Sequence, residues 1–183
     1  MDSYSKAAAG AQARANGEYF ELMIEAASRF YEDRGLAVVE KTPEPMKVIK
    51  PYDRKKGQFI CCFSKRAQPD FKGILTDANM VLFDAKHTQQ NQISRDVVTQ
   101  EQENCFERYM AMGAMCFIVI SVKFTSFYRV PWIVFRDMKK IFGHKFMNRS
   151  ELQPYEVKYS NGILHFLDGI ELRERNEDED SEV

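Results

Sequence analysis

Hydrophobic residues in the first part of the chain recur at the three- and four-residue spacing of one helix face. Between Phe20 and Tyr31 they fall at positions 20, 23, 24, 27, 30 and 31, and Gly35 follows where such a helix would end. The spacing predicts a helix that ends before Gly35, and LAVVEK at 36–41 then predicts a strand. Prolines at positions 43, 45 and 51 interrupt regular structure beyond this strand.

The middle of the chain alternates apolar runs with turn residues. Residues 46–67 contain two short apolar runs around the basic turn DRKKG and predict a protruding hairpin, called the stalk below. FKGILT and MVLFDAK predict two strands joined by the turn DAN. A helix is expected over 99–112, and MCFIVISV at 115–122 predicts a central strand covered on both faces. The core order is therefore helix, three strands, helix, strand.

The remaining segments define the expected domain organisation. RDMKKIF predicts a short helix, and Asn161-Gly162 predicts a hairpin turn. With 183 residues, one domain is expected, which covers residues 16–170. Residues 1–15 are predicted to be a flexible N-terminus, and the charged residues 171–183 a disordered acidic tail.

Composition indicates a globular protein inside the cell. Hydrophobic residues make up 44% and charged residues 29% of the chain. The longest apolar run is far shorter than the roughly 20 residues that span a bilayer, and the N-terminus does not resemble a secretory signal. We therefore expect no membrane segment and a cytoplasmic location. The four cysteines have no CxxC spacing and are expected to be reduced thiols used in packing.

The net charge of −1 conceals an uneven distribution. The tail 171–183 has seven acids and two bases, a net of −5, so the other 170 residues sum to +4. Nine lysines and arginines lie between positions 41 and 72, against three acids. Clustered cations of this kind suit a polyanion such as nucleic acid, although a solvated lysine-rich loop would give the same pattern.

Two carboxylates and a lysine lie in or beside the central strands. Side chains alternate along a strand, so Asp84 and Lys86 share one face, and Asp70 at the head of the preceding strand can pair beside them. Two close carboxylates repel each other unless a proton or a cation lies between them, and Mg²⁺ is the usual cation. The alternative is an ordinary ion pair on a solvated sheet face.

Two further polar residues lie on the predicted helices. Gln102 is on the helical face that should pack against the sheet, so its amide needs a partner. A structural hydrogen bond to the backbone and a catalytic role both remain open for it. Glu21 belongs to an acidic stripe with Glu18 and Glu25, and such stripes usually face solvent.

Taken in order, these segments resemble the PD-(D/E)xK nuclease superfamily, and within it the RecU-type Holliday junction resolvases. The resemblance runs from about Asn16 to Gly143 and includes NGEYFELMIEAASRFYEDRGLAVVEKTPEPMKVIK, QPDFKG, FDAKHT and EQENCF. It implies a restriction-endonuclease-like α/β core, in which a mixed sheet is flanked by helices and carries the basic stalk. Asp84 stands where these resolvases usually have glutamate, which shortens the ligand arm.

The resemblance also implies an activity and roles for particular residues. It implies a dimeric, Mg²⁺-dependent endonuclease, with Mn²⁺ as a substitute, that resolves four-way DNA junctions in recombination and repair. Asp70 and Asp84 resemble the metal-binding acids, with the Ala85 carbonyl as a third oxygen, and Lys86 resembles the catalytic lysine. Glu21 resembles the helical acid that completes the metal shell through water or holds the lysine. Gln102 resembles the glutamine close to that lysine.

The stalk would enter the centre of the junction and contact phosphates. The residues expected to contact DNA are Lys47, Lys50, Arg54, Lys55, Lys56, Lys65, Arg66, Lys72 and His87. Two alternatives stay open. One is a nuclease of the same superfamily that acts on flaps, ends or duplex DNA, and the other is a non-catalytic protein that binds junctions.

Overall fold

A mixed five-stranded sheet forms the centre of the molecule, and the computed structural model describes residues 3–43, 45–63 and 68–170. The strands lie in the order β1 (Ala37–Lys41), β4 (Phe71–Leu75), β5 (Met80–Thr88), β7 (Met115–Val122) and β8 (Ser126–Pro131). β5 and β7 run parallel, and the other neighbouring strands run antiparallel. β5 is the middle strand of the sheet, with β4 and β7 on either side of it.

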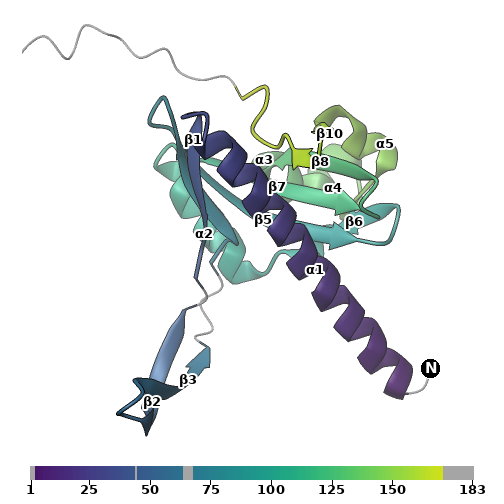
Figure 1. The fold of residues 1–183 in the computed structure, drawn as a ribbon. Helices are drawn as coiled ribbons and strands as arrows, with labels where there is room; N and C mark the ends of the chain where they lie inside the picture. Colours follow the sequence, from purple (N-terminus) through teal and green to yellow (C-terminus); the bar gives the residue numbers. More distant parts are fainter. Residues whose placement is uncertain (1–2, 44, 64–67, 171–183) are drawn as a thin grey trace, which may run out of the picture.

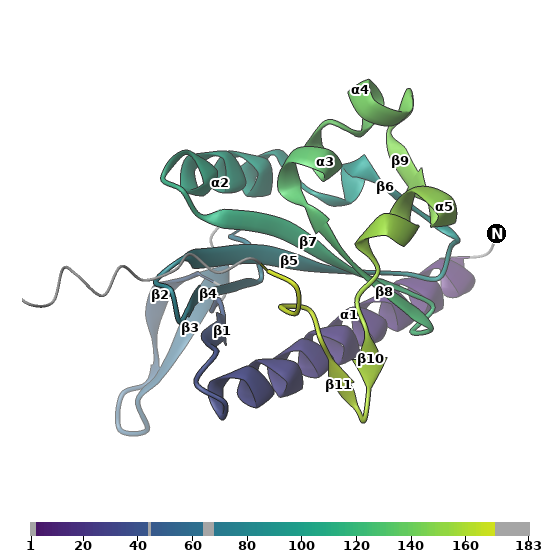
Figure 2. The same ribbon diagram turned by 90° about the horizontal axis from the view of Figure 1, so that it is seen from above.

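Two helices cover opposite faces of this sheet (Figure 2). α1 (Ser3–Glu32) packs Phe20 and Ile24 into one cluster of buried residues, which includes Phe83 of β5. α2 (Gln100–Ala111) packs Phe106 into a second cluster on the other face, which includes Ile118 of β7. The predicted order of helix, three strands, helix and strand is confirmed, and so is the α/β fold with a flanked mixed sheet.

The first helix begins earlier than the hydrophobic spacing of the sequence predicts. α1 starts at Ser3, so the segment expected to be a flexible N-terminus is helical from residue 3 onward. Alanines at positions 7, 8, 9, 11, 13 and 15 explain this, because alanine has the highest intrinsic helix propensity. In Figure 1 this part of α1 extends beyond the edge of the sheet.

The predicted stalk is an antiparallel hairpin that projects away from the sheet (Figure 1). It consists of β2 (Met46–Asp53) and β3 (Gln58–Phe63), joined by the basic turn. Apolar side chains are exposed along it, including Met46, Ile49 and Phe59. Cys61 and Cys62 are also exposed here, so the expectation that all four cysteines serve packing is wrong for these two.

Several small elements complete the fold on either side of the sheet. They are α3 (Trp132–Arg136), α4 (Met138–Phe142), α5 (Arg149–Leu152), β6 (Gln92–Ser94), β9 (Phe146–Asn148), β10 (Tyr159–Ser160) and β11 (Ile163–Leu164). β6 pairs with β9, a sheet that the hydrophobic pattern does not reveal. The Asn161-Gly162 turn between β10 and β11 is confirmed, with φ values of 54° and 78° that suit a tight hairpin.

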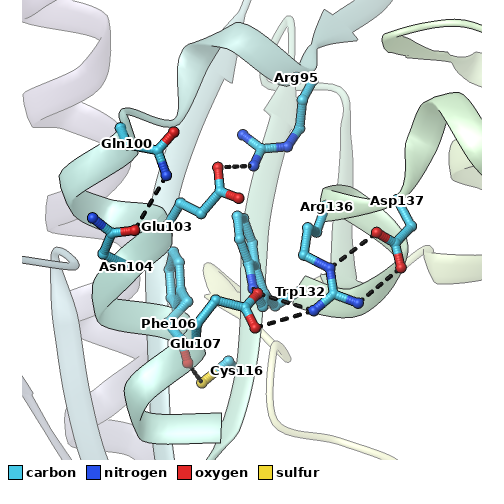
Figure 3. Close-up of polar contacts among 10 residues, drawn as sticks. All are labelled: Arg95, Gln100, Glu103, Asn104, Phe106, Glu107, Cys116, Trp132, Arg136 and Asp137. Carbon is cyan, nitrogen blue, oxygen red and sulfur yellow. Dashed lines mark hydrogen bonds and ion pairs between the residues drawn. The ribbon is translucent and has the colours of Figure 1, made fainter.

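Polar contacts fix α2 against α3 (Figure 3). The Trp132 indole N–H donates a 2.7 Å hydrogen bond to Glu107, and Arg136 lies 3.0 Å from the same carboxylate. Arg95 pairs with Glu103 at 2.6 Å, and its guanidinium lies over the Trp132 ring. These contacts hold the helix that carries Gln102 in one position.

Within the residues that the structure describes, no helix is long and apolar enough to cross a membrane.

Candidate active site

Asp70 and Asp84 lie side by side at the point where β4 begins and β5 runs past it. The antiparallel pairing of Phe71 with Phe83 sets this register, because Asp70 directly precedes Phe71 and Asp84 directly follows Phe83. The Asp70 N–H donates a 2.9 Å hydrogen bond to Asp84 Oδ1, and the Ala85 N–H donates one of 2.9 Å to Asp70 Oδ2. Backbone donors therefore hold both carboxylates next to each other.

Lys86 approaches the carboxylate pair from the same face of β5. Its Nζ lies 2.9 Å from Asp84 Oδ2 and 3.8 Å from Asp70 Oδ2. The Asp84 side chain is fully buried, and no hydrogen bond of ordinary geometry from the described residues reaches its Oδ2. The 2.9 Å approach is thus a contact of charges rather than a well-directed hydrogen bond. This buried oxygen is therefore incompletely bonded.

The environment disfavours two negative charges in this site. Burial, followed by the charge of Asp84, raises the pKa of Asp70 to about 7. Burial also raises the pKa of Asp84, although Lys86 opposes the shift. Burial alone would lower the pKa of Lys86, but the two carboxylates outweigh it and raise that pKa. Lys86 is therefore an ammonium at neutral pH, and the carboxylate pair would be relieved by a proton or a further cation.

The oxygen atoms of this pair fit a hard divalent cation. Mg²⁺ is typically held by one or two carboxylates, with water and phosphate as its other ligands. The incompletely bonded Oδ2 of Asp84 and the mutual repulsion of the pair are the two features that such an ion would satisfy. Within the described residues, no larger group of His, Cys, Asp or Glu side chains is gathered as a metal site.

Glu21 lies near this pair of aspartates and is held there by an ion pair with Lys41. The sequence pattern does not predict this position for Lys41. Its charge raises the pKa of both aspartates, which places α1 close to the site. Glu21 Oε2 lies 2.6 Å from the Nζ of Lys41, the last residue of β1. Lys41 appears in the sequence only as one of many basic residues. Its position depends on the pairing of β1 with β4, in which Lys41 stands opposite Phe71.

Gln102 is buried on the inner face of α2, as the helical pattern predicts. Its side-chain Oε1 accepts a 3.1 Å hydrogen bond from the Thr99 backbone N–H, and the Gln102 backbone N–H donates to Thr99 Oγ1. This reciprocal arrangement is a capping box, which satisfies backbone donors at the start of a helix. The structural role left open for Gln102 is therefore present, and a catalytic role stays a prediction.

The residues expected to contact DNA lie on the stalk and on strands β4 and β5. His87 lies on the face of β5 opposite Lys86, where burial lowers its pKa. The exposed basic residues are Lys47, Lys50, Arg54, Lys55 and Lys56 on the stalk and Lys72 on β4. Lys65 and Arg66 lie outside the described residues, as does the acidic tail.

Thr42 also lies beside Asp70 without having been singled out in the sequence. Its N–H donates a 2.8 Å hydrogen bond to the Asp70 carbonyl oxygen. Its buried hydroxyl has no hydrogen-bond partner among the described residues.

Comparison with known proteins identifies the family. "Holliday junction resolvase RecU" of Streptococcus gordonii is 26% identical over 168 residues, which cover 87% of this chain and 82% of that protein. The protein of the same name from Geobacillus sp. is 22% identical over 170 residues, with 87% and 83% coverage. A solved structure of Archaeoglobus fulgidus Hjc, a Holliday junction resolvase, aligns with a TM-score of 0.48 at 10% identity, over 76% of this chain and 93% of that one. Residues 15–172 match the family model described as "RecU: Recombination protein U", and the chain therefore belongs to the RecU family.

Proposed function

We propose that this chain is an endonuclease that resolves four-way DNA junctions by metal-dependent hydrolysis of phosphodiester bonds. The observation that carries the proposal is the buried pair of Asp70 and Asp84, with Lys86 in contact, in a chain of the RecU family. The names of the relatives from Streptococcus gordonii and Geobacillus sp. support the junction as the substrate.

Mg²⁺, or Mn²⁺ in its place, would be held by Asp70, Asp84 and the Ala85 carbonyl oxygen. Glu21 would reach the ion through water, since Lys41 already occupies one of its carboxylate oxygens. When bound, the cation would polarise the scissile phosphate and lower the pKa of a water molecule. The two carboxylates would then be relieved of the repulsion that raises the pKa of Asp70.

Lys86 would act as a cation toward the reacting phosphate. Because the carboxylates raise its pKa, its ammonium stays protonated and does not serve as a general base near neutral pH. Asp84 holds this ammonium at 2.9 Å, so its charge is directed before the substrate arrives. Negative charge that builds up on the attacked phosphate would be stabilised by this pre-positioned donor. We propose that the Gln102 amide helps to orient the lysine or the attacking water.

The stalk would bind the junction through its backbone phosphates. Five cations lie exposed along it and at its turn, namely Lys47, Lys50, Arg54, Lys55 and Lys56. Tyr52 and Phe59 are exposed on the same hairpin and offer faces on which bases can stack. Such contacts select DNA by shape and weaken as salt rises. Lys72 would contact DNA closer to the carboxylates. His87, whose ring nitrogens contact Ser121 and Gln89, would contribute there by holding a neighbouring side chain.

A homodimer would meet the symmetry of the substrate. A junction is resolved by cutting two strands of like polarity, and a two-fold dimer provides one site for each strand. The exposed apolar side chains of the stalk support association, since an isolated two-stranded hairpin is only marginally stable in water.

Cleavage of a synthetic four-way junction tests this function. Wild-type protein should nick the junction symmetrically in Mg²⁺ and not in EDTA, and should leave a linear duplex of the same sequence intact. Equal or faster cutting of flaps, ends or duplex would support another nuclease of the superfamily. Tight junction binding with no cleavage in Mg²⁺ or Mn²⁺ would support a non-catalytic binding protein.

A further inference from the structure

The polar loop that follows β5 carries an exposed glutamine held in a defined position. Gln89 lies just beyond the end of β5, three residues after Lys86. Its side-chain Nε2 is 3.0 Å from His87 Nε2, although the side chain itself is on the surface. An exposed glutamine normally samples many rotamers, so this contact marks a side chain whose orientation is set by its neighbours.

The hydrogen bonds around His87 define what Gln89 can still offer. An amide nitrogen can only donate, so His87 Nε2 accepts from Gln89. His87 Nδ1 then carries the ring proton and donates to Ser121 Oγ at 3.1 Å. Gln89 keeps one N–H donor and its carbonyl acceptor for a further partner.

The His87 ring is fixed by an aromatic stack. Phe124 stacks on it with a centroid distance of 4.0 Å, and Tyr19 packs edge-on against Phe124 at 5.3 Å. Phe124 and Lys123 have φ values of 55° and 54°, a conformation that residues other than glycine rarely adopt. The Lys123 N–H donates a 2.9 Å hydrogen bond to the Thr88 carbonyl, which ties this strained turn to the end of β5.

We propose that Gln89 reads the major-groove edge of an adenine beside the scissile phosphate and so sets the base preference of cleavage. An adjacent amide donor and acceptor match the N7 acceptor and N6 donor of adenine, which is the usual bidentate contact of glutamine with DNA. His87 acts as a positioning residue, because it orients the amide. The inference rests on the proposed function, since it needs a DNA substrate at the carboxylate site.

Gln89 follows directly after β5, so it is close to Lys86 along the chain, although His87 projects from the opposite face of that strand. Three residues of extended chain span about 10 Å, so the Gln89 backbone lies within that reach of Lys86. Successive bases are spaced by roughly 3.4 Å, which places such a contact within about three steps of the phosphate that Lys86 would approach. Tyr19, at the other end of the aromatic stack, precedes Glu21 by two residues on α1. The loop and the carboxylate site are therefore joined by both β5 and α1.

The test is junction cleavage with base pairs randomised around the cut, followed by sequencing of the products. Wild type should favour adenine at one position by about five- to a hundredfold, the discrimination expected of a bidentate contact. Gln89→Ala should abolish this ratio, which is compared within one reaction and does not depend on the total rate. His87→Phe keeps a ring against Phe124 but removes the acceptor, and should reduce the same ratio. Gln90→Ala, at the exposed neighbouring position, should retain the wild-type ratio.

Three results would overturn the inference. Gln89→Ala could retain the adenine preference, or Gln90→Ala could abolish it as fully as Gln89→Ala does. Wild type could also cut junctions without any base preference, which would leave the proposed resolvase function intact. Failure of the wild type to cut any junction in Mg²⁺ or Mn²⁺ would instead overturn the proposed function, and the inference with it.

Discussion

Lys41 Nζ lies 2.6 Å from Glu21 Oε2, so an ion pair joins the end of β1 to α1 at the edge of the carboxylate site. The contact with Glu21 raises the pKa of Lys41, and Asp70 adds to the same shift. Glu21 in turn raises the pKa of Asp70 and Asp84. Lys41 is therefore a cation that holds Glu21 close to Asp70 and Asp84, whose charges already repel each other.

Replacement of Lys41 by methionine should lower junction cleavage more than it lowers stability. The pair is partly exposed, so its removal should reduce the free energy of unfolding by only about 1 kcal/mol or less. The cleavage rate should fall by about tenfold or more, because Glu21 would no longer be held in place. Lys139→Met, on the exposed surface of α4, is the control. Equal cleavage by Lys41→Met and wild type would contradict this role.

In metal-free protein, the Asp70 carboxyl should favour the folded state less as pH rises. The folded-state pKa of Asp70 is about 7, well above the value near 4 of an unfolded aspartate, so the folded state binds the proton more tightly. The contribution of Asp70 to the free energy of unfolding should therefore fall between about pH 4 and pH 7. Asp70→Asn removes this contribution, and its stability relative to wild type should be higher at pH 8 than at pH 5 by about 1 kcal/mol or more.

Urea unfolding in EDTA at the two pH values measures this difference. The carboxylate of Asp84 is present in both proteins, so the comparison reports the loss of the Asp70 charge together with its repulsion by Asp84. A relative stability that is the same at pH 5 and pH 8 would show that burial does not disfavour the Asp70 charge.

The pairing of β1 with β4 depends on Gly73. A Cβ atom added there would lie 2.4 Å from the Val38 carbonyl oxygen and 2.9 Å from Val39 Cα, both backbone atoms that cannot rotate away. Gly73→Ala should therefore lower the free energy of unfolding by roughly 1–3 kcal/mol. Gly10→Ala on α1, where nothing lies within 4 Å, should leave stability unchanged or raise it. Equal stability of the two variants in urea would contradict the close approach.

The basic turn of the stalk should determine how strongly junction binding depends on salt. Lys55 and Lys56 are exposed at this turn, between β2 and β3. Removing one lysine that binds a phosphate should reduce the slope of log affinity against log salt by about 1. The double variant Lys55→Ala and Lys56→Ala should therefore show a slope smaller by about 2, with Lys139→Ala unchanged. An unchanged slope in the double variant would place the phosphate contacts elsewhere.

The core of the fold could be predicted because its strands and helices carry strong local patterns. The apolar run at 115–122 matches β7, and the apolar residues from position 80 match β5. The two-residue period of a strand then places Asp84 and Lys86 on one face. β6 and β9 could not be predicted, because each has three residues and is defined by pairing with a distant partner. The helical N-terminal segment was accessible from its alanine content, which the hydrophobic periodicity does not register.

The candidate site also contains residues that the sequence predicts and residues that it does not. Asp70, Asp84 and Lys86 could be brought together in advance because one strand register relates them. Lys41 and Thr42 could not, since their proximity to Asp70 depends on how β1 pairs with β4 across the stalk insertion. The partner of Gln102 was accessible from the sequence, because Thr99 followed three residues later by Gln102 is the pattern of a capping box.

Cleavage of a four-way junction by wild type and Asp84→Asn, in Mg²⁺ and at equal salt, tests the central claim most directly. Asn keeps the size of the side chain and an acceptor for the Asp70 N–H, but removes the charge that contacts Lys86. We expect symmetric nicking by wild type only, with junction affinity of the variant within a few-fold of wild type. Cleavage by Asp84→Asn at the wild-type rate would contradict the central claim, because the carboxylate pair could then not be the catalytic site.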